Sequence, residues 1–324
     1  MTQIQVRHRI QSWVIRQGID ALGNNLAALD KQMRILIIDG HAFAYRAFFA
    51  IRDLSSLSGQ PTNAIYGFIN MLEKFEAQVL PSHTVVVWDG GLDEGRVEEL
   101  SDYKDQRDPM PDDMEVQLDE IEAYLAASGI ASVCHEGVEA DDRIGQLTKT
   151  AESEGFEVAI ASSDKDFFQL VNDRVRIWNP SDKSGEPMDE NAVKMKTGVR
   201  PHQIVDWLSL VGDAADNIPG VRGIGVKTAA ALLNEFGSVN SIYERLEDVK
   251  REKQRQALAD SESDVRRNQE LVSLKLDLED EPELESLRKG FEDTVQLEKL
   301  YEKWGFKAKL ANLREARQSV LFDE

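Results

Sequence analysis

Three short apolar segments, each leading into an aspartate, most constrain how this chain folds. The segments are Ile35–Ile38, Thr84–Trp88 and Val158–Ala161, and they lead into Asp39, Asp89 and Asp164. Apolar runs this short are typical of strands that are buried on both faces of a sheet. Stretches with helical spacing lie between them, at 64–78, 111–128 and 140–154. Strands that alternate with helices predict an α/β protein with a mostly parallel central sheet and helices on both faces.

Five acidic residues around the third apolar segment predict a metal site. Glu139 and Asp142 stand three apart in the first turn of the helix predicted at 140–154, with Asp141 between them. Asp164 and Asp166 stand two apart just beyond a strand, so they point the same way. Any one of these residues also fits ordinary turn and cap chemistry. Five like charges together repel unless cations lie between them, and oxygen ligands without His or Cys suit Mg²⁺ or Mn²⁺.

Composition excludes several classes of protein and of binding site. The 324 residues allow one large domain or two modest ones. The single cysteine, Cys134, excludes an internal disulfide and a cysteine-based zinc site. No apolar run approaches the ~20 residues of a membrane span, and without the apolar core of a secretory signal the expected location is cytoplasmic. The net charge of −21 disfavours a nucleic-acid partner unless a locally basic track lies on an acidic body.

The chain divides by the character of its segments. We expect an N-terminal extension at 1–33, a core at 34–200 with a polar insertion at about 90–112, a helical part at 201–290, and a packing helix with a tail at 291–324. The extension fits a weak amphipathic helix or a floppy segment, and Met33 is an alternative start. The insertion fits a lid over the site or a solvated loop, and composition does not separate the two.

The helical part adds two features. Asp213 and Asp216 stand three apart and join the metal site if this segment folds back onto the core. Gly223–Thr228 reads as a hairpin that opens a helix, where glycines let a phosphate approach backbone N–H groups. A nucleotide triphosphate site is excluded, because Val226 separates Gly225 from Lys227 where the phosphate-binding loop requires Gly-Lys-Thr, and no strand directly precedes it.

These segments form an ordered set of motifs between Arg34 and about Phe306. They are Ile38–Arg46, Gln60–Phe68, Val87–Asp89, Tyr103–Arg107, Glu139–Asp142, Ser163–Asp166 and Gly212–Ala229. The set resembles the 5′-nuclease family of bacterial 5′–3′ exonucleases, the N-terminal domain of DNA polymerase I and the flap endonucleases. The resemblance implies a PIN-like nuclease core, with an arch at the insertion, followed by a helix–hairpin–helix module.

The resemblance also implies the roles of particular residues. The metal ligands would be Asp39, Asp89, Glu139, Asp141, Asp142, Asp164, Asp166, Asp213 and Asp216. Tyr45 would stack on a base near the scissile bond, and Lys104 and Arg107 would meet the displaced strand and act in catalysis. The further nucleic-acid contacts would be Arg46, Gly223, Ile224, Gly225, Lys227 and Thr228. A potassium ion would lie on the main-chain carbonyls of Leu210, Val211, Pro219, Val221 and Ile224.

The implied activity is metal-assisted hydrolysis of DNA at 5′ ends, flaps or nicks, in replication and repair, by a monomer that binds two or more Mg²⁺ or Mn²⁺. His41 is expected to be structural, because it points to the opposite face from Asp39 if the strand continues. The insertion departs from the family in its acidity, and no polymerase region follows Phe306, so a free-standing nuclease is expected. The alternatives are an RNA-directed nuclease on a related fold, a catalytically inactive DNA-structure binder and a small-molecule phosphatase.

Overall fold

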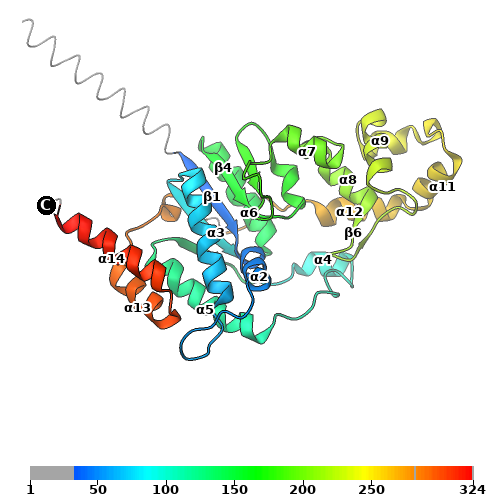
Figure 1. Cartoon of the computed structure of the whole chain (residues 1–324). Helices are drawn as coiled ribbons and strands as arrows, with labels where there is room; N and C mark the ends of the chain where they lie inside the picture. Colours follow the sequence, from blue (N-terminus) through cyan, green and yellow to red (C-terminus); the bar gives the residue numbers. More distant parts are fainter. Residues whose placement is uncertain (1–32, 281, 323–324) are drawn as a thin grey trace, which may run out of the picture.

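A five-stranded parallel sheet forms the centre of the molecule in the computed structural model, which describes residues 33–280 and 282–322 (Figure 1). The strands are β1 (Arg34–Asp39), β2 (His83–Trp88), β3 (Ala131–Cys134), β4 (Glu157–Ala161) and β5 (Val175–Trp178). Their order in the sheet is β3-β2-β1-β4-β5. In the middle of the sheet Ile37 pairs with Val85 on one side and Ile160 on the other. The prediction of a mostly parallel sheet is confirmed.

The three predicted strands are β1, β2 and β4, and the sequence reading missed β3 and β5. All six residues of β2 are buried, whereas buried or half-buried residues alternate with more exposed ones along both missed strands. Both are four residues long and lie at the edges of the sheet. A short edge strand lacks the continuous apolar run on which the prediction relied.

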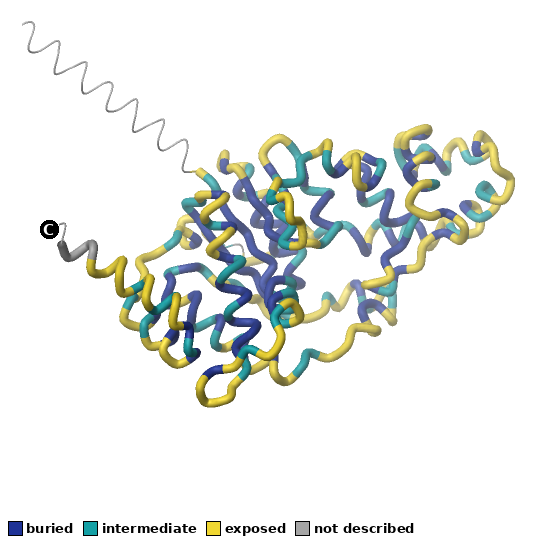
Figure 2. Tube along the Cα trace, in the orientation of Figure 1, coloured by how far each residue is buried: buried dark blue, intermediate teal, exposed yellow. Residues whose placement is uncertain are grey.

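Helices cover both faces of the sheet, as predicted, because alternate strand residues point to opposite sides. Leu36, Ile38 and Val86 pack on one face against α2 (Gly40–Ala50), α3 (Asn63–Val79) and α5 (Asp112–Ala127). Ile35, Ile37 and Val85 pack on the other face, where α6 (Ala140–Ser153) lies. Figure 2 shows that the buried residues concentrate on the strands between these layers. Two C-terminal helices, α13 (Thr294–Trp304) and α14 (Lys307–Phe322), adjoin the first layer through α5.

The first strand turns directly into α2 at the edge where the acidic residues lie. Oδ1 of Asp39 accepts a hydrogen bond from the backbone N–H of Ala42 and so caps the helix. Gly40 is needed here, because a Cβ at this position would lie 2.6 Å from the ring of Trp88. The strand therefore does not continue through His41, and the premise that placed this side chain on the opposite face was wrong.

The C-terminal helical part lies at the opposite end of the molecule from α13 and α14 (Figure 1). Its helices are α8 (Ile204–Val211), α9 (Val226–Phe236), α10 (Val239–Glu244), α11 (Glu252–Asp260) and α12 (Glu262–Val272), and α7 (Glu190–Thr197) precedes them at the end of the core. A two-stranded hairpin, β6 (Gly212–Asp213) and β7 (Ile218–Pro219), separates α8 from α9. The apolar core runs without a break from Ile35 in the sheet to Val265 in α12. The domain boundary expected at residue 200 remains a prediction.

Four 3-10 turns complete the described elements: η1 (Asp166–Leu170), η2 (Pro201–Gln203), η3 (Leu246–Asp248) and η4 (Leu284–Leu287). The predicted insertion contains a short helix, α4 (Glu94–Glu99), in addition to irregular chain. The predicted extension at 1–33 lies outside the described residues except for Met33. Within the described part of the chain, no helix is both long and apolar enough to span a bilayer.

Candidate metal centre and nucleic-acid interface

The carboxyl edge of the sheet brings the aspartates of three strands together. Asp39 ends β1, Asp89 follows β2 and Asp164 follows β4 by three residues. Oδ2 of Asp39 accepts a hydrogen bond from Oγ of Ser162 at 2.9 Å. Burial raises the pKa of Asp39 to about 6, and the charges of Asp164 and Asp89 add to this rise against the opposing hydrogen bonds. The carboxylates therefore repel one another, as the sequence predicted.

Asp141 joins this group from the first turn of α6. Burial raises its pKa well above the usual value, and the charges of Asp164 and Asp39 add to the effect. The pKa of Asp164 is also raised, first by burial and then by the charges of Asp216 and Asp213. Asp164 thus links the carboxylates at the sheet edge to those of the helical part.

Asp166, Asp213 and Asp216 form a second group, which we call the three-aspartate cluster. One carboxylate oxygen of each lies within 4.8 Å of those of the others. Asp166 belongs to η1, beyond β4, whereas Asp213 ends β6 and Asp216 lies in the turn before β7. Burial raises the pKa of Asp166 well above its usual range, with Asp164 and Asp213 as the next causes. The hairpin of the helical part therefore does fold back to the core.

The three-aspartate cluster has the chemistry that a hard divalent cation requires. Its donors are all oxygens, which Mg²⁺ and Mn²⁺ prefer. Oδ1 of Asp166 is buried and has no hydrogen-bond partner among the described residues. A buried carboxylate oxygen without a donor is costly in a folded protein, and a bound cation would remove that cost. The residues present fit such an ion.

Glu139, the N-cap residue of α6, and Asp142, in its first turn, do face a common cation, but that cation is Arg96 from α4. Nη1 of Arg96 lies 2.9 Å from Oε2 of Glu139 and 2.7 Å from Oδ2 of Asp142, and Nη2 donates to Oδ1 of Asp142 at 2.8 Å. All three side chains are at least 95% buried. Asp142 Oδ1 also accepts a hydrogen bond from the backbone N–H of Lys275. Both oxygens of Asp142 are thus engaged within the chain, which differs from the role expected for it.

Sequence reasoning missed Arg96, although one signal was available. It is the sole basic residue between Asp89 and Lys104, in an otherwise acidic stretch. A lone arginine in such a run is a candidate partner for a buried carboxylate, but its partners lie 43 and 46 residues further along the chain. Lys165, which lies between Asp164 and Asp166, was also given no role; its Nζ lies 3.0 Å from Oδ1 of Asp213.

The predicted arch residues lie against the candidate metal centre. Nζ of Lys104 is buried and lies 2.7 Å from Oε2 of Glu139, while Arg107 Nη2 lies 2.7 Å from Asp216 Oδ1. Burial alone would raise the pKa of Glu139, but Lys104 and Arg96 outweigh burial and lower it. Lys104 takes a left-handed backbone conformation, with φ of 57°, and its N–H donates to the carbonyl of Asp216. Such a conformation is uncommon for a lysine and is typical of functional segments.

Tyr45, Arg46 and His41 lie on α2, close to the carboxyl edge. Tyr45 stacks on Phe49 with a centroid distance of 6.3 Å, and Phe49 is largely exposed. Arg46 donates a hydrogen bond to Oγ of Ser181, in the segment after β5. Nδ1 of His41 accepts a hydrogen bond from the backbone N–H of Asp89 at 3.2 Å. His41 thus holds the loop that carries Asp89, while the base-stacking role of Tyr45 remains a prediction.

The segment Gly223–Thr228 leads from the β6–β7 hairpin into α9. Gly220, just before it, approaches the carbonyl of Val211 so closely that a Cβ would lie 2.0 Å from the oxygen. Of the carbonyls expected to hold potassium, those of Leu210, Pro219 and Val221 already accept hydrogen bonds within the chain. A potassium ion would share these oxygens, and its presence remains a prediction.

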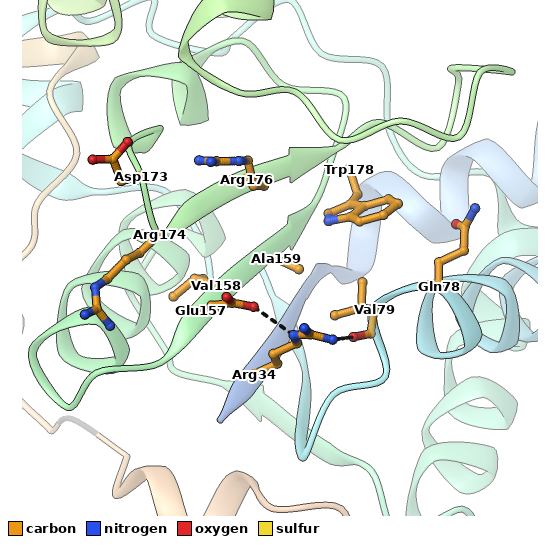
Figure 3. A pocket seen from close by; sticks show the side chains of 10 residues that line it. All are labelled: Arg34, Gln78, Val79, Glu157, Val158, Ala159, Asp173, Arg174, Arg176 and Trp178. Atoms are coloured by element: carbon orange, nitrogen blue, oxygen red, sulfur yellow. Dashed lines mark hydrogen bonds and ion pairs between the residues drawn. The ribbon is translucent and has the colours of Figure 1, made fainter. Parts of the chain in front are cut away.

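A separate hollow lies at the other end of the strands (Figure 3). Its volume is about 230 Å³, and its lining includes Arg34 and Glu157, the first residues of β1 and β4, together with Arg176 and Trp178 of β5. Arg34 pairs with Glu157 at 2.8 Å and donates to the carbonyl of Val79. No residue that the sequence assigned to the site lines this hollow, so the acidic edge and this hollow are distinct places.

The fold and the acidic edge together define a class of α/β proteins that gather divalent cations at the carboxyl edge of a parallel sheet. Comparison with known proteins makes the assignment specific. Residues 34–198 match the 5′-3′ exonuclease N-terminal resolvase-like domain, and residues 199–295 match the 5′-3′ exonuclease C-terminal SAM fold. The chain belongs to the 5′–3′ exonuclease family, whose members include flap endonucleases and are metal-dependent nucleases.

Two relatives are identical to this chain at about two fifths of the aligned positions. The 5′-3′ exonuclease of Aquifex aeolicus is 42% identical over 67% of this chain and 75% of its own length. DNA polymerase I of Caldicellulosiruptor bescii is 40% identical over 67% of this chain and 26% of its own length. The chain thus spans about a quarter of the DNA polymerase I relative.

Solved structures are similar in fold. T5 5′-exonuclease with bound zinc is 25% identical, with a TM-score of 0.62 over 75% of this chain and 90% of that chain. The catalytic core of Rad2 in complex with a DNA substrate has a TM-score of 0.58 over 84% of this chain and 88% of that chain. At 17% identity the Rad2 likeness is one of fold alone.

Proposed function

We propose that this chain is a structure-selective 5′–3′ exonuclease and 5′-flap endonuclease that hydrolyses DNA phosphodiesters with bound Mg²⁺ or Mn²⁺. One observation carries the proposal most directly. Core and helical part together supply the three-aspartate cluster, in which a buried oxygen of Asp166 has no partner among the described residues. A protein that only binds DNA has no need to hold mutually repelling carboxylates together, so the cluster supports a catalytic role.

We assign the metal ligands to two groups, and the charge of Asp164 in the first group acts on the second. Asp39, Asp89, Asp141 and Asp164 would hold one cation, and the three-aspartate cluster would hold another. Bound divalent cations supply hydroxide from water near neutral pH and stabilise charge on phosphoryl oxygens. We place Glu139 and Asp142 outside direct ligation. Their contacts with Arg96 and Lys104 support a role in holding α4 and the arch against α6.

The arch residues would act on the phosphate rather than on the metal. Arg107 is half exposed where it meets Asp216, so its guanidinium can exchange that carboxylate for a phosphate oxygen. Lys104 is buried on Glu139 and would need the arch to move before it reached the substrate. We therefore propose Arg107 as the first arch contact with DNA and Lys104 as a later one. Tyr45 and Arg46, on α2, would meet the nucleotides beside the scissile bond.

A groove beside the predicted hairpin supports a grip on duplex DNA. It encloses about 320 Å³ between α9 and the start of α11, and Lys227, Thr228, Lys250 and Arg251 are among the residues that line it. Lys250 pairs with Glu235, whereas Lys227 and Arg251 form no ion pair with any described residue. Cations left free on a body with a net charge of −21 mark where phosphates would bind. Contacts of this kind read the backbone and not the bases, which favours selection by structure.

The test compares substrates and a matched pair of variants. The full chain is incubated with labelled 5′-flap, nicked and blunt DNA and with an RNA hairpin, with Mg²⁺ or with a chelator. Wild type is expected to cut flap and nicked DNA only with Mg²⁺. Asp166→Asn is expected to reduce turnover by more than about 10²-fold, as removal of groups that stabilise transition-state charge does. Asp277→Asn, in an exposed pair with Lys149, is the control and keeps full activity.

The outcomes separate the remaining candidates. Preferred cleavage of the RNA hairpin would favour an RNA-directed nuclease. Tight flap binding without cleavage, at any divalent ion, would favour an inactive DNA-structure binder. A role in replication and repair, a monomeric state, a cytoplasmic location, potassium at the hairpin and the division at residue 200 complete the proposal. Our proposal excludes nucleotide triphosphates as ligands, because Val226 interrupts the required Gly-Lys-Thr sequence.

A further inference from the structure

Lys165 is flanked directly, on both sides in the sequence, by acidic residues of the centre. It lies between Asp164 and Asp166 in sequence, yet its ammonium reaches across to the helical part. Nζ of Lys165 lies 3.0 Å from Oδ1 of Asp213, whose side chain is 8% exposed, while the lysine side chain is 36% exposed. The pair therefore joins a partly exposed ammonium on a long flexible side chain to a buried carboxylate.

A second basic side chain lies where the core meets the helical part. Arg107 of the arch lies 2.7 Å from Oδ1 of Asp216 and is 49% exposed. Each acid that the helical part contributes thus holds a basic side chain from outside that part, whereas Oδ1 of Asp166 holds none among the described residues. The two ion pairs offset the repulsion within the three-aspartate cluster, and they do so with groups that can leave.

We propose that Lys165 is a positioning residue, which holds Asp213 beside Asp166 in the metal-free protein and releases it when a divalent cation binds the cluster. This inference rests on the metal site of the proposed function. An ammonium and a divalent cation that share Oδ1 of Asp213 repel each other, so the weaker ligand must withdraw. With 36% of its side chain exposed, Lys165 can swing away into solvent and leave Asp213 to the divalent cation.

Removing the Lys165 ammonium should have two opposite effects: weaker protection of the hairpin amides and stronger binding of Mg²⁺. The metal-free protein loses one of the contacts that hold the β6–β7 hairpin to the core, so the amides of 212–218 become less protected from hydrogen exchange. The metal site loses a competing positive charge, so the affinity for Mg²⁺ rises. If Lys165 had only a general structural role, its removal would lower both the amide protection and the affinity for Mg²⁺, since a disordered site binds metal less well.

The experiment uses the full chain and needs no turnover. Calorimetric titration with Mg²⁺ and hydrogen exchange in a chelator are compared for wild type, Lys165→Met, Lys165→Arg and Lys149→Met. Lys149→Met is the control, since Lys149 pairs with Asp277 at 2.7 Å, away from the centre. We expect Lys165→Met to lower the Kd for Mg²⁺ by about tenfold, the effect typical of removing one nearby like charge, and to raise hydrogen exchange at 212–218. Lys165→Arg and the control should stay close to wild type.

Each other outcome supports or overturns a definite claim. Normal Mg²⁺ binding by wild type, together with unchanged or weaker binding by Lys165→Met, overturns this inference and leaves the proposed function standing. A wild-type chain that binds no Mg²⁺ overturns the proposed function, and this inference with it. If Lys165→Met folds only when Mg²⁺ is present, the place-holding role is supported, because metal then replaces the missing ammonium. A variant that stays unfolded with Mg²⁺, while Lys165→Arg also fails to fold, contradicts it.

Discussion

Replacing Asp39 by Asn should stabilise the metal-free protein above neutral pH. The pKa of Asp39 is raised from 3.8 to about 6, first by burial and then by the charges of Asp164 and Asp89. A rise of this size corresponds to about 3 kcal/mol, because each pKa unit is worth about 1.4 kcal/mol. Asn keeps the helix cap on α2, since it serves at that position about as well as Asp. Some of the gain is lost at Ser162, which now donates to a neutral group.

The sign of the pH dependence follows from the direction of the pKa shift. A carboxylate whose pKa is higher in the folded state destabilises that state when it is ionised. The cost of the Asp39 charge is therefore fully present above about pH 6, and it disappears as pH falls through the raised value toward 3.8. The variant should exceed wild type by about 2 to 3 kcal/mol at about pH 8, and the two should converge at about pH 4.

Urea unfolding in the presence of a chelator measures this difference across the pH range. Asp277→Asn, which removes an exposed carboxylate, is the control and should show little difference from wild type at any pH. Added Mg²⁺ should then reverse the order, because a cation that binds the folded wild type stabilises it by mass action. An Asp39→Asn variant that is no more stable than wild type at about pH 8, or a difference that does not change with pH, would refute the argument.

Three further predictions concern other parts of the molecule. Arg96→Met should lower the free energy of unfolding by about 3–5 kcal/mol in urea titration, because buried Asp142 loses its ion-pair partner and buried Glu139 keeps only Lys104. Lys149→Met should cost less than about 1 kcal/mol in the same titration. Lys227→Ala should reduce the slope of log affinity for duplex DNA against log salt by about 0.9, as measured by fluorescence anisotropy in a chelator; an unchanged slope would place the duplex elsewhere. Gly220→Ala should disrupt the β6–β7 hairpin, since the new Cβ would meet the carbonyl of Val211 at 2.0 Å, and faster hydrogen exchange there would report it.

The local pattern of the sequence predicted the parallel sheet and the edge at which the acidic residues gather. Ile35–Ile38 and Val158–Ala161 are continuous apolar runs, and both faces of the sheet are covered by helices. Parallel strands end at one edge, so the aspartates that follow them had to be neighbours. The edge strands β3 and β5 were not predicted, because partial exposure interrupts their apolar pattern.

Only the tertiary structure decided which charges meet. Glu139 and Asp142 are paired with Arg96, and Asp213 with Lys165, across separations of tens of residues. Periodicity fixes which face of its own element a side chain occupies, but it carries no information about the charge on the facing element. The partner of a buried carboxylate is selected by the packing of distant segments, since any cation brought within about 4 Å can stabilise it. The sequence by itself therefore determined where acidic oxygens collect, and the packing determined which of them are already neutralised and which are left for a metal ion.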